Sequence, residues 1–346
     1  MKKYQVVENY GNLQHAGSKA TNDCSEILSQ SGYQPLPIKL LNDKSNVFSK
    51  ITRQIHNMIS WSNLYSKVEK DSVLVLQHPF RRNHYGRFAN LMKLKERKNV
   101  KIISLVHDVE LIRNIFDLEF YQKEMDQMIQ FAHKIIVHNE KMRQWFIDYG
   151  VKPEQLEVLE IFDYLIENSG SKVVSFSKNV YIAGNLSKDK SPYVYELGQI
   201  SSVAFQLMGI NYDDTYESSN VTYLGAFSPD DVPKQLTNGF GLVWDGDSLD
   251  TCSGPTGNYL RYNNPHKLSL YLASDLPVIV WSDSAEADFV LKNGLGLTVS
   301  SLRELETQLA DLSEEDYSVF LSNVRKVSKQ LRDGHFLKQA LSRSIK

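Results

Sequence analysis

A helix start rich in polar and cationic side chains is the feature of this chain best suited to chemistry. In the segment NNPHKLSLYLASDLPVIV, at 263–280, Asn264, Pro265 and Lys267 open a helical pattern that a short turn joins to a buried strand. Free backbone N–H groups and the helix dipole attract an anion at such a start, where a lysine is unfavourable unless a negative group offsets it. The segment therefore predicts a site for the diphosphate of a nucleotide, with a tolerated surface lysine as the alternative.

A second part of the same site is predicted in the segment NVYIAGNLSKDKSP, at 179–192. Its apolar strand runs into Gly184 and Asn185, which allow a sharp turn, and Lys188 and Lys190 follow closely enough to neutralise phosphate. An ordinary turn between a strand and a helix, with solvated lysines, is the alternative interpretation. Both segments lie in the second half of the chain, which we interpret as the nucleotide-binding domain.

Two glycine-containing loops are further candidates for ligand contacts. In YLGAFSPDD, at 223–231, Phe227 lies on a predicted turn. Its ring either covers a pyrimidine base or packs the loop onto the core, and the sequence favours neither role. In ENYGNLQHAGSKAT, near the N-terminus, Gly11, Gly17 and Ser18 precede a helix and form a donor-rich turn able to approach a phosphate. This spacing does not fit the G-x-G-x-x-G fingerprint, so no nicotinamide site is predicted.

Carboxylates follow two of the apolar strands. Asp108, in VHDVELIR at 106–113, lies at the carboxyl end of a strand, where it is a candidate base for an acceptor hydroxyl; capping the next helix is the alternative role. Asp245 and Asp247 have the Asp-x-Asp form that suits Mg²⁺ or Mn²⁺. Two aspartates at this spacing also arise by chance, and metal-binding folds of that type carry the nucleotide domain first, so we predict no metal ion.

Composition excludes several other classes of protein. The chain of 346 residues suits two domains of about 150 residues each, and its charged content of 23% is ordinary. A net charge of −2 argues against a general nucleic-acid binder. No apolar run approaches the ~20 residues of a membrane span, and the N-terminus lacks a signal-peptide core. With only Cys24 and Cys252, no disulfide framework is implied, so a cytoplasmic location is expected.

Alternating strand and helix patterns predict an α/β fold. Near-continuous apolar runs indicate strands of parallel sheets that are covered on both faces, and we place them at Tyr4–Val7, Val73–Gln77, Val100–Val106 and Lys134–Val137, then at Val180–Ala183, Val221–Leu224, Phe240–Trp244, Val278–Val280 and Gly296–Val299. Helices are expected near 21–30, 120–132, 139–150, 191–200, 264–274 and 284–292, and from an N-cap at Ser313 onward. The predicted architecture is two Rossmann-like doubly wound domains facing a cleft, with divisions at 1–162, 163–178 (a serine-rich linker), 179–325 and 326–346 (a helix returning to the first domain).

Short motifs in this order resemble a known family. The chain resembles two-domain GT-B glycosyltransferases, and more narrowly the bacterial glucosyltransferases that extend N-acetylglucosamine on serine-rich repeat adhesins, together with galactofuranosyltransferase-like relatives. The resemblance is carried by His107–Val109, Gly184–Asn185, Pro229–Asp230, GFGLVW at 239–244, Lys267–Leu268, LASDLPVIV at 272–280 and KNGLG at 292–296. These motifs run from the middle of the first domain to near the C-terminus.

The resemblance implies a UDP-sugar donor held mainly by the second domain, without a metal ion or other cofactor. By position, Lys188 and Lys267 fall on the cationic phosphate contacts of the family, and Phe227 falls beside the uracil. Ala16 and Gly17 fall on the first-domain loop that touches the donor, next to Ser18. The chain departs from the family by extra residues in 186–190 and 247–258 and by His15, Ala16 and Ser18.

The function expected from the resemblance is metal-independent transfer of a hexose. Glucose from UDP-glucose is the expected donor sugar, a GlcNAc-modified serine-rich repeat adhesin the expected acceptor, and a homo-dimer or tetramer the expected assembly. The donor contacts are expected from Ala16, Gly17, Ser18, Gly184, Asn185, Lys188, Phe227, Asn264 and Lys267. A galactofuranosyl- or GlcNAc-transferase of cell-surface polysaccharide synthesis, and a non-catalytic glycan-binding partner of an enzyme, are the alternatives.

Overall fold

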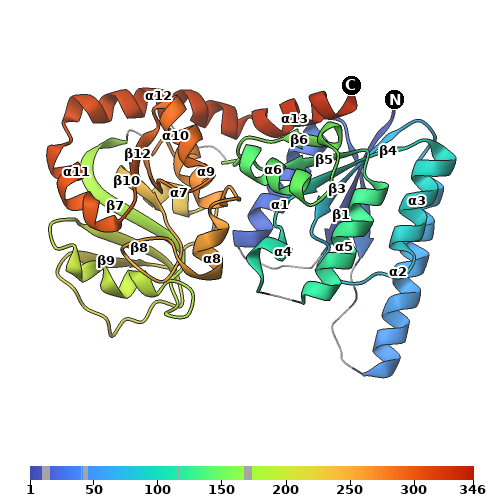
Figure 1. The fold of residues 1–346 in the computed structure, drawn as a ribbon, viewed down its shortest axis with the longest axis horizontal. Helices are drawn as coiled ribbons and strands as arrows, with labels where there is room; N and C mark the ends of the chain where they lie inside the picture. The colour runs from blue at the N-terminus through green and yellow to red at the C-terminus, as the bar shows by residue number, and fades with distance from the viewer. Residues whose placement is uncertain (10–15, 40, 42–45, 116, 167–173) are drawn as a thin grey trace. The chain divides into compact units, whose positions relative to one another are not determined.

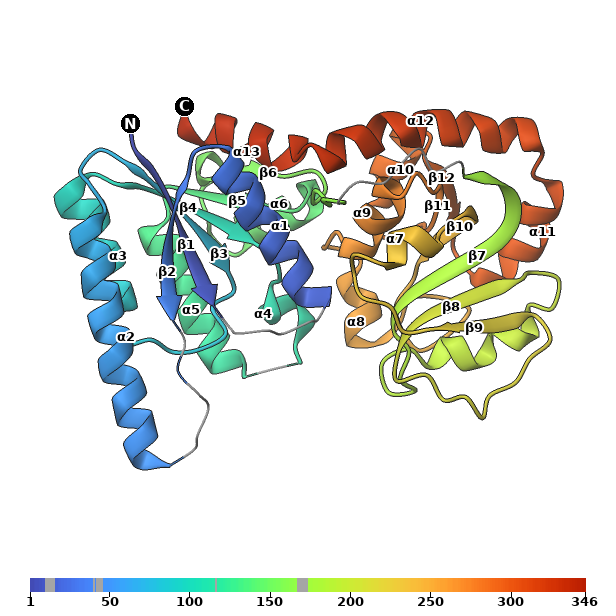
Figure 2. The same cartoon turned by 180° about the vertical axis from the view of Figure 1, so that it is seen from behind.

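The chain folds into two compact units. The computed structural model describes residues 1–9, 16–39, 41, 46–115, 117–166 and 174–346. Unit 1 groups Met1–Gln14, Thr21–Leu159 and Leu337–Lys346, and unit 2 groups His15–Ala20 and Glu160–Phe336. Each unit is built on a six-stranded sheet with helices packed around it (Figure 1 and Figure 2). The expected class, two doubly wound α/β domains, is confirmed.

The sheet of unit 1 has the strand order β2-β1-β3-β4-β5-β6, with every neighbouring pair parallel. Its strands are β1 (Lys3–Asn9), β2 (Gln34–Lys39), β3 (Val73–His78), β4 (Lys101–Val106), β5 (Lys134–Val137) and β6 (Leu156–Val158). Its helices are α1 (Ala16–Gln30), α2 (Val47–Lys67), α3 (Arg87–Lys98), α4 (Glu110–Arg113), α5 (Leu118–Phe131), α6 (Glu140–Asp148), η1 (Pro153–Gln155) and α13 (His335–Ile345). Apolar residues fill the central strands β3 and β4 because helices cover both faces of a parallel sheet.

The sheet of unit 2 has the order β12-β11-β10-β7-β8-β9, again parallel throughout. Its strands are β7 (Ser175–Asn185), β8 (Phe205–Ile210), β9 (Val221–Gly225), β10 (Asn238–Val243), β11 (Val278–Trp281) and β12 (Gly296–Val299). Its helices are η2 (Pro192–Gln199), α7 (Val232–Gln235), α8 (Gly254–Tyr259), α9 (His266–Ala273), α10 (Ala287–Asn293), η3 (Leu302–Glu304), α11 (Leu305–Asp311) and α12 (Glu314–Arg332).

Close packing of α9 on the sheet of unit 2 fixes the helix that carries Lys267. The ring of Tyr271 lies where a side chain on Gly241 would be, since a methyl group there would come within 2.1 Å of the ring. The Tyr271 hydroxyl also accepts a hydrogen bond from the backbone N–H of Ala183 at 2.8 Å. A glycine in β10 and a backbone N–H of β7 therefore set the depth of α9 against the strands.

The structure differs from the expected elements at several places. β7 begins at Ser175, so the last residues of the expected linker, 163–178, belong to a strand, and the helix expected at 191–200 is the 3₁₀ helix η2. β2, β6 and β8 were not predicted. The expected N-cap at Ser313 is confirmed, with a reciprocal capping box to Asp316. In the part of the chain that the structure describes, no helix is both long and apolar enough to cross a bilayer.

Candidate functional site

Lys267 and Asp245 form an ion pair in unit 2, with 3.1 Å between Nζ and Oδ1. Lys267 lies in the first turn of α9, which begins at His266, and this confirms its predicted place at a helix start. Asp245 follows the carboxyl end of β10. The two side chains are 23% and 16% exposed, so water reaches the pair only in part and the attraction is stronger than at an open surface.

Gly184 lies directly against this lysine. It is the penultimate residue of β7 and has a φ of +149°, and a methyl group placed on it would lie 3.3 Å from Lys267 Cε and 3.7 Å from Nζ. The aliphatic end and ammonium of Lys267 therefore pack over bare backbone. The two segments that the sequence singled out, around Gly184 and around Lys267, meet at the carboxyl ends of neighbouring strands β7 and β10.

Glu286 is a buried carboxyl group that the sequence analysis missed. It is 1% exposed, and within the described residues neither carboxyl oxygen has a hydrogen-bond partner. Burial, followed by the negative charge of Asp245, raises the pKa of Glu286 well above its usual range, and Lys267 opposes this shift. We call Gly184, Asp245, Lys267 and Glu286 the Lys267 cluster. A protonated Glu286 offers an O–H donor, which makes it suited to a ligand hydroxyl or carbonyl.

Cys252, beside the cluster, is not a nucleophile. Its thiol is buried, and burial raises the pKa far above the usual value. The thiolate is the reactive form, and the environment of Cys252 disfavours it. The chemistry that the Lys267 cluster supports is therefore electrostatic: an ammonium and a helix amide end that together favour an anionic ligand.

Asn264 and Asn185 hold the backbone around the cluster. The Asn264 amide N–H donates to the carbonyl of Glu160, a residue with a φ of +81°. Asn185 Oδ1 accepts from the backbone N–H of Ser187 and from Asn211, both at 3.1 Å. Both predicted contact residues thus have positioning bonds of their own, and a direct contact of either with the donor stays a prediction.

Lys188 and Phe227 lie elsewhere in unit 2. Lys188 pairs with Asp213 and lies over the Tyr195 ring, 5.2 Å from its centroid, and its side chain is 61% exposed. Its hydrogen bond to Asp213, then the charge of that carboxylate, raises the pKa of Lys188. Phe227 is half-buried in the loop after β9. No contact joins either residue to the Lys267 cluster within the described chain, so their donor roles also stay predictions.

The predicted loop near the N-terminus lies at the start of α1. Gly11 and His15 fall outside the described residues, and Ala16, Gly17 and Ser18 form the first helical turn, of which the structure describes only the backbone. This turn groups with unit 2. The next residue, Lys19, donates to the Leu165 carbonyl at 2.8 Å and pairs with Asp230 at 3.1 Å.

Asp108, the candidate base, lies in unit 1 after the carboxyl end of β4. Its Oδ2 is 3.4 Å from the Arg113 guanidinium, which also pairs with Glu110 at 3.1 Å. Burial raises the pKa of Glu110, an effect that Arg113 opposes. The capping alternative is wrong, because the N-cap of α4 is Val109 and not Asp108. Asp108 is thus an ion-paired carboxylate at the edge where ligands of such sheets bind.

The two carboxylates of the Asp-x-Asp segment have different neighbours in the described structure. Asp245 pairs with Lys267, whereas Asp247 lies against Gly254, where a methyl group would come within 2.6 Å of Oδ2. Among the described residues, no three His, Cys, Asp or Glu side chains gather closely enough to hold a metal ion.

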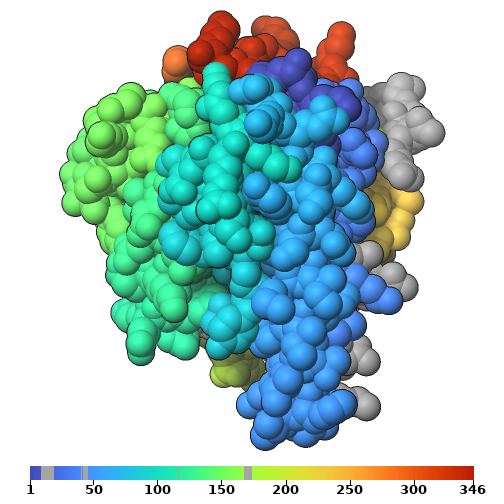
Figure 3. Space-filling view, turned by 90° about the vertical axis from the view of Figure 1, so that its right-hand side faces the viewer, coloured from blue at the N-terminus to red at the C-terminus, as the bar shows by residue number. Residues whose placement is uncertain are grey.

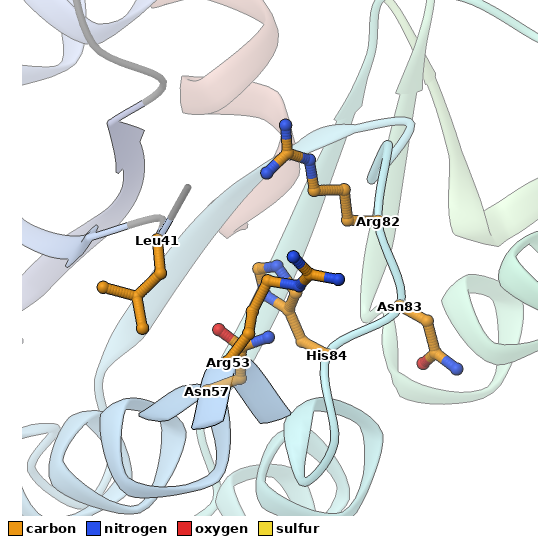
Figure 4. Close-up of a pocket in the computed structure, with 6 residues that line it drawn as sticks. All are labelled: Leu41, Arg53, Asn57, Arg82, Asn83 and His84. Carbon is orange, nitrogen blue, oxygen red and sulfur yellow. The ribbon is translucent and has the colours of Figure 1, made fainter. Parts of the chain in front are cut away.

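A small pocket of unit 1 is lined by Leu41, Arg53, Asn57, Arg82, Asn83 and His84 (Figure 4). The Trp61 indole N–H donates to His84 Nδ1 at 3.3 Å, and burial, then the charges of Arg87 and Arg82, lower the pKa of His84 to about 4. His84 is therefore neutral at pH 7, and the 3.8 Å approach of Glu8 to Nδ1 is not an ion pair. The cavity volume of about 10 Å³ admits one water molecule and is too small for a nucleotide.

The fold and the site together define the class of protein. Two parallel-sheet α/β units, with a cationic helix start at the carboxyl ends of the strands of the second, are the architecture of a GT-B glycosyltransferase. The Anabaena protein Alr3699/HepE, solved in complex with UDP, has this fold: it superposes with a TM-score of 0.63 at 12% identity and covers 99% of both chains.

Sequence comparison then shows the family. The N-terminal domain model of "Glucosyltransferase 3-like" proteins matches residues 3–161, and the C-terminal domain model matches 180–344. The chain belongs to this Glucosyltransferase 3-like family and is a glycosyltransferase. It is 30% identical to the β-1,6-galactofuranosyltransferase WbbI of Escherichia coli (strain K12), over 95% of this chain and 94% of that protein. Glucosyltransferase 3 of Streptococcus gordonii is 25% identical, over 98% and 97%.

Proposed function

We propose that this protein transfers a hexose, most simply glucose, from a UDP-sugar to a sugar already carried by a protein, a GlcNAc-modified serine-rich adhesin. The observation that carries the donor assignment is the Lys267 cluster, in which the ammonium of Lys267, at the amide end of α9, lies over the bare backbone of Gly184. Structures of the Anabaena protein with UDP and with UDP-glucose support the donor class. The names of the streptococcal relatives support glucose.

The chemistry follows from the charges of the cluster. As the bond from the sugar to UDP breaks, negative charge grows on the diphosphate, and Lys267 with the N–H groups of α9 stabilises that charge. A bound diphosphate competes with Asp245 for the ammonium. Because Lys267 supplies the positive charge, we propose that transfer needs no divalent ion.

Deprotonation of the acceptor is proposed to fall to unit 1. Asp108 lies 3.4 Å from the Arg113 guanidinium, and a carboxylate is the form that accepts a proton from an acceptor hydroxyl. If Asp108 is the base, Asp108→Asn lowers turnover while donor binding, measured by titration with UDP, is unchanged. Unchanged turnover in that variant removes the proposed role of Asp108.

A second candidate donor is UDP-galactofuranose. The observation in its favour is that the galactofuranosyltransferase WbbI shares 30% identity with the chain, whereas the two streptococcal glucosyltransferases share 25% and 22%. The acceptor is then a sugar of a surface polysaccharide. The two candidates differ in the sugar transferred and share the predicted diphosphate site.

A thermal-shift screen followed by an activity assay tests the proposal. UDP-glucose, UDP-galactofuranose and UDP-N-acetylglucosamine are compared with and without EDTA, since a ligand that binds only the native state raises the melting temperature. We expect UDP and one UDP-hexose to raise the melting temperature, each by the same amount with and without EDTA. No shift with any UDP-sugar contradicts the donor assignment, and activity that EDTA abolishes and Mn²⁺ restores favours Asp245 and Asp247 as metal ligands. The cytoplasmic location and the dimer or tetramer stay predictions.

A further inference from the structure

The first half of α2 exposes an unusual number of large apolar side chains. Phe48 is 81% exposed and Val47 73%, and they are followed along the helix by Ile51, Ile55, Met58 and Ile59, each about half exposed. With Tyr85, at 62%, they make up seven of the fifteen exposed large hydrophobic residues in the described chain. Scattered single side chains need no explanation, but a contiguous apolar patch marks an interaction site.

These side chains share one side of the helix. At 100° per residue, the six α2 positions fall within an arc of about 120°, while the residues buried against the unit, Asn57, Trp61 and Leu64, lie on another side. The loop with Tyr85 lies alongside, because its backbone N–H donates to Gln54 Oε1 at 3.1 Å. We call Val47, Phe48, Ile51, Ile55, Met58, Ile59 and Tyr85 the α2 face. The first half of α2 extends past the sheet of unit 1 (Figure 1) and stands out at the bottom of the space-filling view (Figure 3).

The charged side chains of the first half of α2 and of the adjoining loop are positive. The first half of α2, VFSKITRQIHN at 47–57, has Lys50 and Arg53 and no carboxylate, and at 100° per residue both lie outside the apolar arc, with Lys50 the nearer to it. The loop at 79–86, PFRRNHYG, adds Arg81 and Arg82, again without a carboxylate. A second copy placed on this face by two-fold symmetry would bring like charges together, whereas an anionic surface would attract them. An apolar helix side accompanied by cations is typical of helices that lie in the membrane interface.

We propose that the α2 face docks unit 1 onto an anionic phospholipid surface. Phe48 and its apolar neighbours enter the boundary between headgroups and acyl chains, and the exposed Lys50 and Arg81 lie among the phosphates. The inference stands apart from the proposed transfer reaction, because docking is measured without donor, acceptor or turnover. If both hold, the enzyme meets its acceptor at a membrane surface.

Co-sedimentation with sucrose-loaded vesicles tests the docking. The full chain is mixed with vesicles of phosphatidylcholine alone, or of phosphatidylcholine and phosphatidylglycerol, and we expect binding to the mixed vesicles that salt weakens. The double variant Phe48→Ser, Ile51→Ser should bind at least about tenfold more weakly, since it removes two large inserted side chains. Lys50→Ser should lower binding to the mixed vesicles about fivefold.

A matched control removes equally exposed apolar side chains elsewhere. Leu291 and Val319 are each 59% exposed on unit 2, so Leu291→Ser, Val319→Ser should leave vesicle binding unchanged. Circular dichroism checks folding, and Ile55→Ser, Ile59→Ser repeats the test should the first pair misfold. The inference is overturned if the wild-type chain ignores both vesicles, if it binds them equally, or if the Phe48 and Ile51 variant binds as well as wild type. It is also overturned if light scattering shows that this variant splits a wild-type oligomer, since a second copy then covers the α2 face.

Discussion

The ammonium of Lys267 lies 3.1 Å from the carboxylate of Asp245, so the cation that the sequence placed at a helix start already has an anionic partner, just beyond the end of strand β10. This pair explains how a lysine is tolerated at the positive end of the α9 dipole. It also means that a diphosphate must compete with a carboxylate for the lysine. The pair is therefore both a stabilising contact and a determinant of donor affinity.

Removing the ammonium tests this role. Lys267→Ala should lower turnover with the UDP-sugar by about 10²–10³-fold, the usual effect of losing one electrostatic contact in a transition state, while the chain stays folded. Release of UDP by the purified variant is the measurement. Lys234→Ala is the control, because Lys234 also pairs with a neighbouring carboxylate but lies 68% exposed outside the cluster. Full activity of Lys267→Ala contradicts the donor-site assignment.

Gly184→Ala should displace the ammonium without changing any charge. The added methyl group would lie 3.3 Å from Lys267 Cε on a backbone with φ of +149°, so we expect a loss of about 1 kcal/mol of stability and a clear fall in UDP affinity. Gly32→Ala is the matched control: its φ is +82°, and nothing lies within 4 Å of the new methyl. Titration with UDP and denaturant unfolding separate the two effects. Equal UDP affinity in both variants contradicts the proposed contact.

The buried carboxyl of Glu286 gives a prediction with a definite sign. Because its pKa is raised in the folded protein, the unfolded chain loses this proton at lower pH, and Glu286 lowers stability as pH rises above the usual carboxyl pKa. Glu286→Gln keeps the shape and a donor but cannot ionise. The variant should therefore be the more stable protein at neutral pH, with the difference shrinking in acid. Urea unfolding at several pH values measures this, and a wild-type protein that is more stable at neutral pH contradicts it.

His138 of unit 1 predicts the opposite pH dependence. It is buried, donates from Nε2 to the Val106 carbonyl at 3.1 Å, and burial lowers its pKa from 6.5 to about 4. The unfolded state binds the proton first, so stability is lost as pH falls from 6.5 toward 4, on the order of 3 kcal/mol in all. His138→Gln should be less stable at neutral pH but should lose less on acidification. Equal acid sensitivity of the two proteins is the contrary outcome.

The parts of the fold that the sequence predicted are those with strong local signals. β3, β4 and β11 are near-continuous apolar runs, which parallel strands buried on both faces require. β2 was missed because QPLPIK contains two prolines and alternates exposed with buried residues, a pattern that an edge strand tolerates. The predicted linker extended too far, to residue 178, because the first residues of β7 are polar and partly exposed and so resemble a loop.

The candidate site was predictable only where chemistry and local structure coincide. Lys267 was recognisable because a lysine is unfavourable at the positive end of a helix dipole, and both the helix start and the lysine can be read from the sequence. Glu286 gave no such signal, since in SDSAEAD it looks like one more solvated acid, and only tertiary packing buries it. The capping role considered for Asp108 was wrong by one position, because Val109 is the N-cap of α4.

The last helix has a practical consequence for producing unit 1 alone. Residues Leu337–Lys346 group with unit 1, where Lys101 Nζ donates to the Ile345 carbonyl at 2.9 Å and Arg343 pairs with Glu157. A fragment that ends at Leu159 therefore lacks α13 and exposes the apolar surface of unit 1 on which that helix packs. Both chain ends lie near each other in unit 1 (Figure 2). A fusion protein that joins α13 to Met1 through a short linker should therefore fold as unit 1 on its own.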